Sequence, residues 1–300
     1  MNVLFDLCKE FQPLRYLNAL MTRAMEIIGL IPAGGHATRI SPLPCSKEIF
    51  PIGWRYDESG IMKPKVVSQY LLDRYRLAGI RKAFFILRKG KWDIPQYYGH
   101  GDMVDMDIAY LIMNHPHGHP FTLDQAYPFV RDSLVAFGYP DILFEPDDAF
   151  TTLIDFQKRT EADVVLGVFP IRPDQRWDIC SFGEDGRMKV VSVPDPPPTL
   201  QRLGWSIAIW TPKFSAFMHE YLADAVRRQQ FKAHDGKEYV MNHVFQAAID
   251  HQLRVEHITF DKGYVRDIGT PSELIAAQTT MTTMPLQGSS GTYSDSPGVQ

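Results

Sequence analysis

Cysteine is scarce in this chain, which has three among 300 residues. They are Cys8, Cys45 and Cys180, an odd number at distant positions. Such a set argues against a disulfide framework and against a zinc knuckle, since both need paired or closely spaced cysteines. The scarcity fits a reducing compartment, and we expect a cytoplasmic protein.

Long apolar runs and an excess of basic charge are also absent. No run approaches the roughly 20 apolar residues that cross a bilayer, and the N-terminal segment has no basic start or small-residue cleavage site of a signal peptide. The formal net charge is −4 and the pI is near 6.2, so we expect neither nucleic acid nor a membrane as a partner. Any anionic ligand must therefore be bound by a few local cations.

What the chain does have is the composition of a globular enzyme, with 45% hydrophobic and 22% charged residues. The apolar pattern predicts a buried strand at residues 27–31, a helix at 66–78 and a second strand at 83–87. This order is typical of a parallel sheet with crossover helices.

The domain organisation follows from similar patterns. We expect an N-terminal extension with a helical pattern at residues 1–25 and one α/β domain at 26–278. The segment 279–300 is rich in Thr, Ser, Gly and Pro and is predicted to be a disordered tail. Within the domain, residues 54–63 are polar and predict an excursion on the surface.

One stretch, residues 27–52, stands apart from this pattern and reads IIGLIPAGGHATRISPLPCSKEIFPI. After the strand, Ala33-Gly34-Gly35 has little side chain, so its backbone N–H groups can point together at an anion. Arg39 and Lys47 follow as fixed positive charges. Neither a Walker A loop nor a dinucleotide fingerprint fits the spacing. Glycines, one Arg and one Lys after a first strand predict a cradle for a polyphosphate.

The same stretch resembles the signature of the sugar-1-phosphate nucleotidyltransferases, especially the glucose-1-phosphate thymidylyl- and uridylyltransferases. That signature is roughly A-G-G-x-G-T-R-L-x-P followed by (S/P)-K-x-x-x-P-I. Ala37 departs from it, because the pattern has Gly there. The matching residues are Ala33, Gly34, Gly35, Thr38, Arg39, Pro42, Ser46, Lys47, Pro51 and Ile52.

The resemblance implies a three-layer α/β fold, with a mixed, mostly parallel sheet flanked by helices. It also implies a reaction in which dTTP or UTP and a sugar 1-phosphate, most closely glucose 1-phosphate, give a nucleotide sugar and pyrophosphate. By the same resemblance, Arg39 would grip the β- and γ-phosphates and Lys47 the α-phosphate, both as catalytic residues. The remaining nucleotide-binding positions would be Ala33, Gly34, Gly35 and Thr38.

Two aspartates are implied as ligands of Mg²⁺, the expected cofactor. Asp141 matches the Asp of the family's strand-then-G-D pattern, although Tyr139 and Pro140 are inserted before it, and it is also counted as catalytic. Asp267 lies in G-Y-V-R-D-I-G-T-P, which is similar to the family's W-x-D-x-G-T-P. Carboxylates that hold Mg²⁺ between two phosphates would supply the charge neutralisation that nucleotidyl transfer needs.

Two departures affect sugar recognition. Asp195 falls where the family has a Lys that holds the sugar phosphate, and Asp178 falls where it has Gly. These favour an alternative, a non-catalytic relative that binds nucleotide sugars and regulates. Glu48, beside Lys47, is predicted to be solvated.

Other motifs give weaker alternatives. Asp105-Met106-Asp107 has the D-x-D form of metal-dependent glycosyltransferases, but it precedes a strand and is predicted to be a solvated turn. His115, His117 and His119 invite a metal site, yet in a Pro- and Gly-rich loop they are expected to line the base and sugar pocket or face water. The sequence leaves the sugar, the base and a homo-oligomer open.

Overall fold

The computed structural model describes residues 25–57, 59–113, 117–175, 177, 179–183, 188–190, 202–230, 232 and 238–283. The predictions for residues 1–24, His115, Asp178 and Asp195, and for the chain from residue 284 on, lie outside these residues. No helix in the described ranges is long and apolar enough to span a membrane.

The centre of the fold is a nine-stranded sheet in which β10, β9, β11, β6, β1, β4 and β5 lie in this order, while β8 pairs with β11 and β12. The run from β6 to β5 is parallel, and β11 is antiparallel to its neighbours, so the sheet is mixed. The strands are β1 (Ile27–Ala33), β4 (Lys82–Leu87), β5 (Asp107–Ile112), β6 (Leu134–Gly138), β8 (Val164–Pro170), β9 (Ile179–Phe182), β10 (Met188–Val190), β11 (Leu203–Trp210) and β12 (Val255–Thr259).

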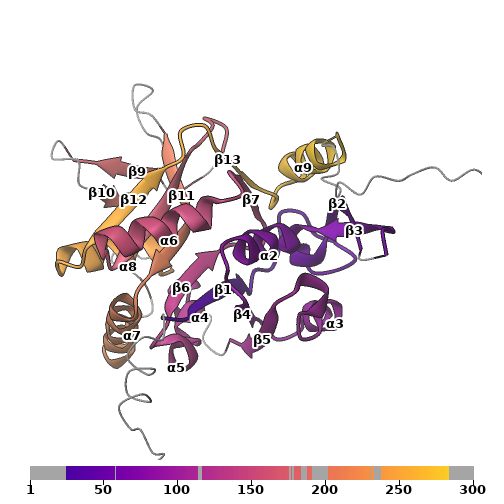
Figure 1. Ribbon diagram of the computed structural model, residues 1–300. Helices are drawn as coiled ribbons and strands as arrows, with labels where there is room; N and C mark the ends of the chain where they lie inside the picture. The colour runs from indigo at the N-terminus through magenta and orange to yellow at the C-terminus, as the bar shows by residue number, and fades with distance from the viewer. Residues whose placement is uncertain are drawn as a thin grey trace, which may run out of the picture.

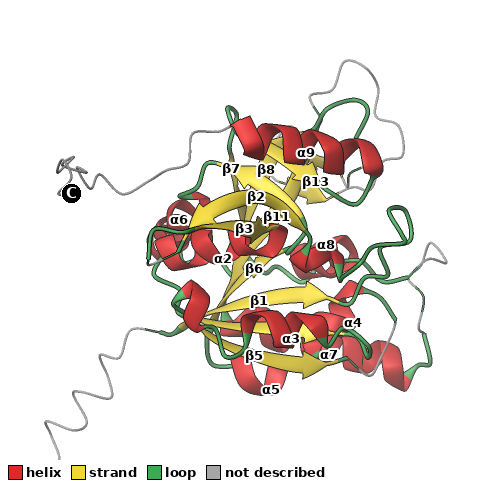
Figure 2. Cartoon of the chain, turned by 90° about the vertical axis from the view of Figure 1, so that its right-hand side faces the viewer, coloured by secondary structure: helices red, strands yellow, loops and turns green. Residues whose placement is uncertain are grey.

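Helices cover both faces of this sheet (Figure 1). The helices are α2 (Val67–Leu77), α3 (Asp93–Tyr98), α4 (His119–Asp124), α5 (Tyr127–Val130), α6 (Ala149–Thr160), α7 (Pro212–Arg227), α8 (Met241–Asp250) and α9 (Pro271–Thr283). In Figure 2, β1 runs between α2 above and α5 below.

Alternation along β1 explains the two layers of core. Ile31 and Ala33 pack into the cluster that contains residues of α2, α3 and α6. Ile28 and Leu30 pack into the cluster with residues of α4, α5, α7 and α8. Since successive side chains of a strand point to opposite faces, an apolar run such as this one needs cover on both sides. The predicted three-layer α/β fold is confirmed.

Two small antiparallel sheets lie beside the central one. β2 (Pro51–Tyr56) pairs with β3 (Met62–Val66), and β7 (Ile142–Glu145) pairs with β13 (Tyr264–Asp267). The first pair occupies the stretch 54–63, where we predicted only a surface excursion. The side chains of this pair are largely exposed. The sequence shows no alternation of apolar and polar residues here, because Trp54 and Tyr56 face outward beside charged residues.

Residues 119–130 form two short helices, α4 and α5, since Pro120 and Pro128 each begin a new helical turn. One further boundary differs from the predictions. Helix α9 continues past residue 278, where we predicted the tail to begin. It packs against β2 through a small apolar cluster that includes Ile52 and Ala277.

Candidate active site

The register of the parallel strands brings several loops to one edge of the sheet. Ala33 lies opposite Leu87 of β4, and Leu30 lies opposite Phe137 of β6. The chain therefore leaves β1, β4 and β6 at nearly the same level. In open α/β sheets, ligands bind outside these carboxyl ends. The glycine-rich loop begins here, directly after Ala33.

The predicted cations and carboxylates meet at this edge as two ion pairs. The ammonium of Lys47 donates to a carboxylate oxygen of Asp141. The guanidinium of Arg39 donates from Nη2 to Oδ2 of Asp267 at 3.1 Å. The four residues come from three distant segments of the chain, so the fold and not local sequence places them together.

Burial makes the first pair the stronger one. Asp141 is 8% exposed, whereas the side chains of Arg39 and Asp267 are 56% and 29% exposed. Burial raises the pKa of Asp141, but the Lys47 ammonium outweighs burial and holds this pKa below its ordinary value. Burial likewise lowers the pKa of Lys47, and the charge of Asp141, with smaller contributions from Glu48 and Asp267, reverses the direction. Both groups are therefore charged near neutral pH.

Strand pairing positions the two carboxylates. Asp267 lies opposite Ile142 in the ladder of β13 and β7, and the N–H of Ile268 donates to the carbonyl of Asp141 at 3.1 Å. The N–H of Gly269 donates to Oδ1 of Asp267 at 2.8 Å, which orients that carboxylate. Because both aspartates raise the pKa of Lys47, both lie within electrostatic reach of it.

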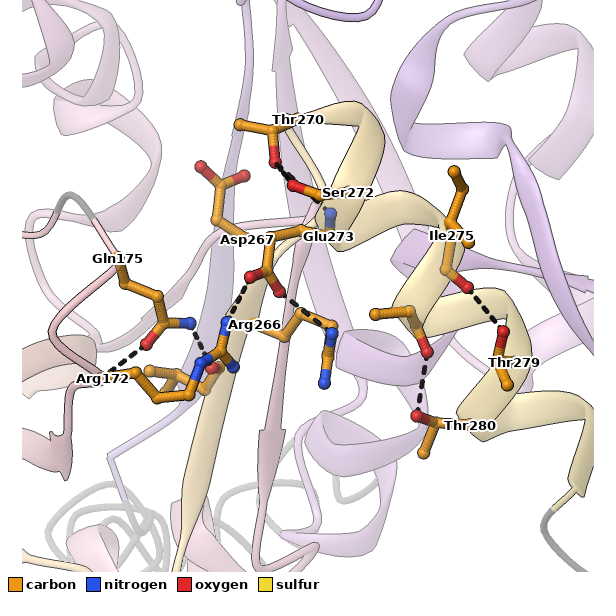
Figure 3. Close-up of polar contacts among 12 residues, drawn as sticks. Arg172, Gln175, Arg266, Asp267, Thr270, Ser272, Glu273, Ile275, Thr279 and Thr280 are labelled. Atoms are coloured by element: carbon orange, nitrogen blue, oxygen red, sulfur yellow. Dashed lines mark hydrogen bonds and ion pairs between the residues drawn. The ribbon is translucent and has the colours of Figure 1, made fainter.

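A network of charged side chains braces the segment around Asp267 (Figure 3). Glu273 of α9 accepts from Nη1 of Arg266 at 3.0 Å and also pairs with Arg172, from the loop after β8. In the same loop, Gln175 donates to the carbonyl of Val265 at 3.1 Å. The carboxylate of Asp267 points away from this network in Figure 3, and it accepts instead from Arg39.

The glycine-rich loop itself lies close to the cations. A side chain added at Gly35 would lie 3.6 Å from Nζ of Lys47, and one at Gly34 would lie 2.9 Å from the sulfur of Met113. Thr38 is exposed in the turn that contains Arg39. Ala37 has a φ of +53°, in the left-handed region. The departure from the family's Gly therefore falls where the backbone conformation favours glycine.

Glu48 is not solvated, contrary to our prediction, but is 1% exposed. Its two carboxylate oxygens accept from the ammonium of Lys91 at 2.6 and 2.7 Å. Burial raises the pKa of Glu48, and Lys91 offsets part of this rise. Lys91 is 8% exposed, and burial lowers its pKa. In the sequence, the signal that Glu48 is buried is that the apolar residues Ile49 and Phe50 follow it.

Asp93 is a residue of the site that the sequence did not single out. Its carboxylate accepts from the backbone N–H of Ser46 at 2.6 Å and from the hydroxyl of Ser46 at 2.7 Å. These bonds fix the residue that precedes Lys47, at the start of the 3-10 helix η1 (Lys47–Ile49). Asp93 thus orients the ammonium of Lys47 indirectly. The sequence signal for such a residue was Ser46 of the signature, because a hydroxyl beside a buried charge needs a hydrogen-bond partner.

The weaker motifs lie elsewhere. Asp105 and Asp107 are exposed, as predicted, at the amino end of β5, the end of the sheet opposite the ion pairs. Asp107 is already the first residue of the strand, so the predicted turn covers only part of the motif. This position disfavours a glycosyltransferase site. His117 and His119 pack against Phe121 and Tyr139, with ring centroids 5.6 Å apart in each case.

The carboxylates suit a magnesium ion by their donor chemistry. Mg²⁺ is usually held by one or two carboxylates, with water and substrate phosphates as further ligands. Asp141 and Asp267 supply such oxygens, which in this structure accept hydrogen bonds from Lys47 and Arg39. No group of three or more His, Cys, Asp or Glu side chains suited to a metal occurs within the described residues.

Comparisons with known proteins concern the fold and the family of the chain. No curated protein matches the sequence. A Bacillus anthracis structure assigned as a glucose-1-phosphate thymidylyltransferase, in complex with sucrose, is 13% identical with a TM-score of 0.67, over 87% of this chain and 98% of that one. A UTP-bound UGPase from Acinetobacter baumannii is 13% identical with a TM-score of 0.67, over 85% and 93%.

At this identity the likeness to solved structures establishes the fold. The sequence model of one family, described as nucleotidyl transferase, matches residues 28–284, which is most of the chain. This match agrees with the sequence signature around Arg39 and Lys47. The chain belongs to the nucleotidyl transferase family.

Proposed function

We propose that the protein joins a nucleoside triphosphate, dTTP or UTP, to a sugar 1-phosphate, glucose 1-phosphate in the first instance. The observation that carries the proposal is the meeting of two cation and carboxylate pairs beside the glycine-rich loop. Lys47 with Asp141, and Arg39 with Asp267, supply both the positive charge for phosphates and the oxygens for Mg²⁺. The two structures reported above add support, since one is named for glucose 1-phosphate and the other contains UTP.

The chemistry requires position and charge rather than a base. An oxygen of the sugar phosphate forms a bond to the α-phosphorus, and the bond from that phosphorus to the bridging oxygen of the β-phosphate breaks. The electron pair leaves with pyrophosphate, and no proton has to move. The attacking oxygen is already anionic, so the protein must hold two anions in line and neutralise them.

Each residue has a role in this proposal. Lys47 binds the α-phosphate, and Arg39 binds the β- and γ-phosphates. The N–H groups of Gly34 and Gly35, with Ala33 and Thr38, complete the nucleotide cradle. Asp141 and Asp267 would hold Mg²⁺, which supplies further positive charge to the phosphates.

Binding of substrate requires the two ion pairs to exchange partners. In the present structure each cation is paired with a carboxylate, Lys47 with Asp141 and Arg39 with Asp267. A phosphate that binds Lys47 or Arg39 replaces a carboxylate, and the carboxylates become available as metal ligands. The net charge of the four side chains is zero, so a triphosphate and Mg²⁺ are expected to bind together better than either alone.

A panel of triphosphates and sugar 1-phosphates, with pyrophosphate release as the readout, tests the proposal. We expect release only when both substrates are present. The regulatory alternative, favoured by Asp178 and Asp195 in the sequence, would bind nucleotide sugar without release. Consumption of nucleotide sugar without pyrophosphate would instead indicate the glycosyltransferase that Asp105 and Asp107 suggested.

A further inference from the structure

A cavity of about 310 Å³ lies between the glycine-rich loop and the loop that follows β4. Gly35, His36 and Lys47 contribute to one wall, and Arg88 and Lys91 contribute to the other. Only the first wall was expected from the signature. The second wall brings two more cations to the same space.

Strand register places the second wall beside the first. Ala33 and Leu87 are opposite each other at the ends of the parallel strands β1 and β4. Gly34 and Arg88 are therefore the first residues beyond the sheet on neighbouring strands. The guanidinium of Arg88 reaches across to the glycine-rich loop, where its Nη1 contacts Nδ1 of the His36 ring and lies 2.7 Å from Nε2.

The charges around the cavity favour an anion. Lys47, Arg88 and Lys91 are the cations of its lining, and Asp93 is the one carboxylate among the lining residues. Lys47 is paired with Asp141, which lies outside the lining. The carboxylate of Asp93 is engaged by the N–H and the hydroxyl of Ser46. Both oxygens of Glu48 bind Lys91 from outside the cavity. An ammonium has three N–H donors, so one carboxylate does not exhaust the bonding capacity of Lys91.

Arg39 alone is a poor match for the leaving group. Its guanidinium is directed at Asp267, 3.1 Å away, and its side chain is 56% exposed. A departing diphosphate carries several negative charges, and charge-assisted bonds from more than one donor are needed to neutralise them. The cavity provides further donors in Lys47, Arg88 and Lys91.

We propose that Arg88 is a second guanidinium of the polyphosphate site: with Lys91 behind it, Arg88 binds the β- and γ-phosphoryl groups and holds them as they leave as pyrophosphate. The inference rests on the proposed function and adds a residue that the signature does not include. The bond that breaks is the one between the α-phosphorus and the bridging oxygen, and that oxygen keeps the electron pair. Arg88 stabilises the resulting charge and transfers no proton.

Direct binding of inorganic pyrophosphate, measured by calorimetry on the full chain, gives the first test. Arg88→Met should weaken binding by about tenfold or more, as expected for loss of a charge-assisted contact. Arg81→Met is the matched control. Arg81 lies just before the amino end of β4, whereas Arg88 follows its carboxyl end, and Arg81 pairs with Asp105 on the surface. Equal affinity in the wild type and Arg88→Met would overturn the inference.

The reverse reaction gives a readout that a structural role of Arg88 would not produce. With UDP-glucose or dTDP-glucose and pyrophosphate as substrates, Arg88→Met should raise the KM for pyrophosphate about tenfold and leave the KM for the nucleotide sugar unchanged. Arg88→Lys keeps the positive charge but loses the bidentate guanidinium, so its KM for pyrophosphate should lie between those of the wild type and Arg88→Met. If both KM values rise together, Arg88 maintains the loop and does not bind pyrophosphate. Should Arg88→Met fail to fold, Arg88→Gln serves in its place.

The two experiments separate this inference from the proposed function. Turnover of both substrates with an unchanged KM for pyrophosphate in Arg88→Met would refute the inference and keep the function. Pyrophosphate binding that depends on Arg88, without turnover of any substrate pair, would keep the site and refute the function. A wild-type protein that binds no pyrophosphate would refute both.

Discussion

Arg39 and Asp267 are joined by a hydrogen-bonded ion pair of 3.1 Å although 228 positions separate them in the sequence. One was predicted to bind phosphate and the other to bind a metal, so the structure pairs the two complementary charges of the site with each other. Lys47 and Asp141 repeat this relationship in a more buried setting. The site is thus internally neutralised, and each partner can be removed separately to test its role.

Arg39→Met should separate metal binding from phosphate binding. The substitution frees the carboxylate of Asp267, and Mn²⁺ serves as a probe for Mg²⁺. In the absence of nucleotide, Mn²⁺ should bind a few fold more tightly, since an exposed ion pair is worth about 0–1 kcal/mol. Binding of dTTP should weaken by about tenfold, because a charge-assisted phosphate contact is lost. Calorimetry measures both quantities.

The control for that experiment is Arg76→Met, which removes an arginine of helix α2 that has no part in the proposed site. Its affinities for Mn²⁺ and dTTP should match those of the wild type. If Arg39→Met weakens metal binding as much as nucleotide binding, the exchange of partners described above is wrong.

Glu48 and Lys91 should behave as one buried unit. Glu48→Met leaves an unpaired buried ammonium, and Lys91→Met leaves an unpaired buried carboxylate, so each should lower the free energy of unfolding by about 3–5 kcal/mol. The double substitution removes both charges and should cost less than either single one. Denaturant unfolding of the four proteins measures this cycle.

An exposed pair serves for comparison. Lys82 lies 2.8 Å from Glu26, and each side chain is 49% exposed. Lys82→Met should change the free energy of unfolding by no more than about 1 kcal/mol. Additive losses in the Glu48 and Lys91 cycle would show that the two residues do not form a buried pair in solution.

Ala37→Gly should stabilise the glycine-rich loop. A non-glycine residue at a φ of +53° carries a cost of about 1–2 kcal/mol, of which the added flexibility of glycine in the unfolded chain cancels about 0.4–1 kcal/mol. A net gain of about 0.5–1 kcal/mol in the free energy of unfolding is expected. Thermal or denaturant unfolding measures it, and a loss of stability would contradict the left-handed conformation at this position.

The Lys47 and Asp141 pair should give a defined dependence of stability on pH. The pKa of Asp141 is below its ordinary value in the folded protein, since Lys47 outweighs the effect of burial. The stability that it contributes is therefore present above the unfolded-state pKa, about 3.9, and is lost as the pH falls through the lower folded-state value. The gap in unfolding free energy between the wild type and Asp141→Asn should be constant above about pH 5 and should close below about pH 4.

Glu48 contributes to that comparison in the opposite sense, because its pKa is raised, mainly by burial. The charge of Asp141 adds to this rise, so only the part caused by burial cancels between the two proteins. A gap that widens on acidification would mean that Asp141 is not held as a carboxylate by Lys47.

Much of the fold was predictable because local pattern and tertiary structure agree. Residues 27–31, 66–78 and 83–87 have strong apolar periodicity, and β1, α2 and β4 form where it predicts them. The predicted helix at 66–78 lies within one residue of α2 at each end, and Gly79 follows with a φ of +78°, which suits a glycine. The β2 and β3 pair was missed because its outward face carries Trp54 and Tyr56, which obscure the alternation of a half-buried strand.

The site was predictable only where a residue takes part in a signature. Arg39, Lys47, Asp141 and Asp267 were named from such patterns, and the structure brings them together. Glu48 was read as solvated, because a charged residue is usually exposed and nothing local announces a partner 43 positions away. Lys91 and Arg88 have no sequence signal of their own, since their role depends on the register of β4 with β1.

The most direct test of the central claim follows the phosphorus atoms themselves. Phosphorus NMR of the protein with dTTP, glucose 1-phosphate and Mg²⁺ should show the signals of a nucleotide sugar and of pyrophosphate growing at equal rates, with UTP tested in parallel. Asp267→Asn should slow both signals by at least a hundredfold, as expected when about 3 kcal/mol of stabilisation is lost at the reacting phosphates. Formation of nucleotide sugar at an undiminished rate in Asp267→Asn, or its absence with every triphosphate and sugar 1-phosphate tried on the wild type, would contradict the account.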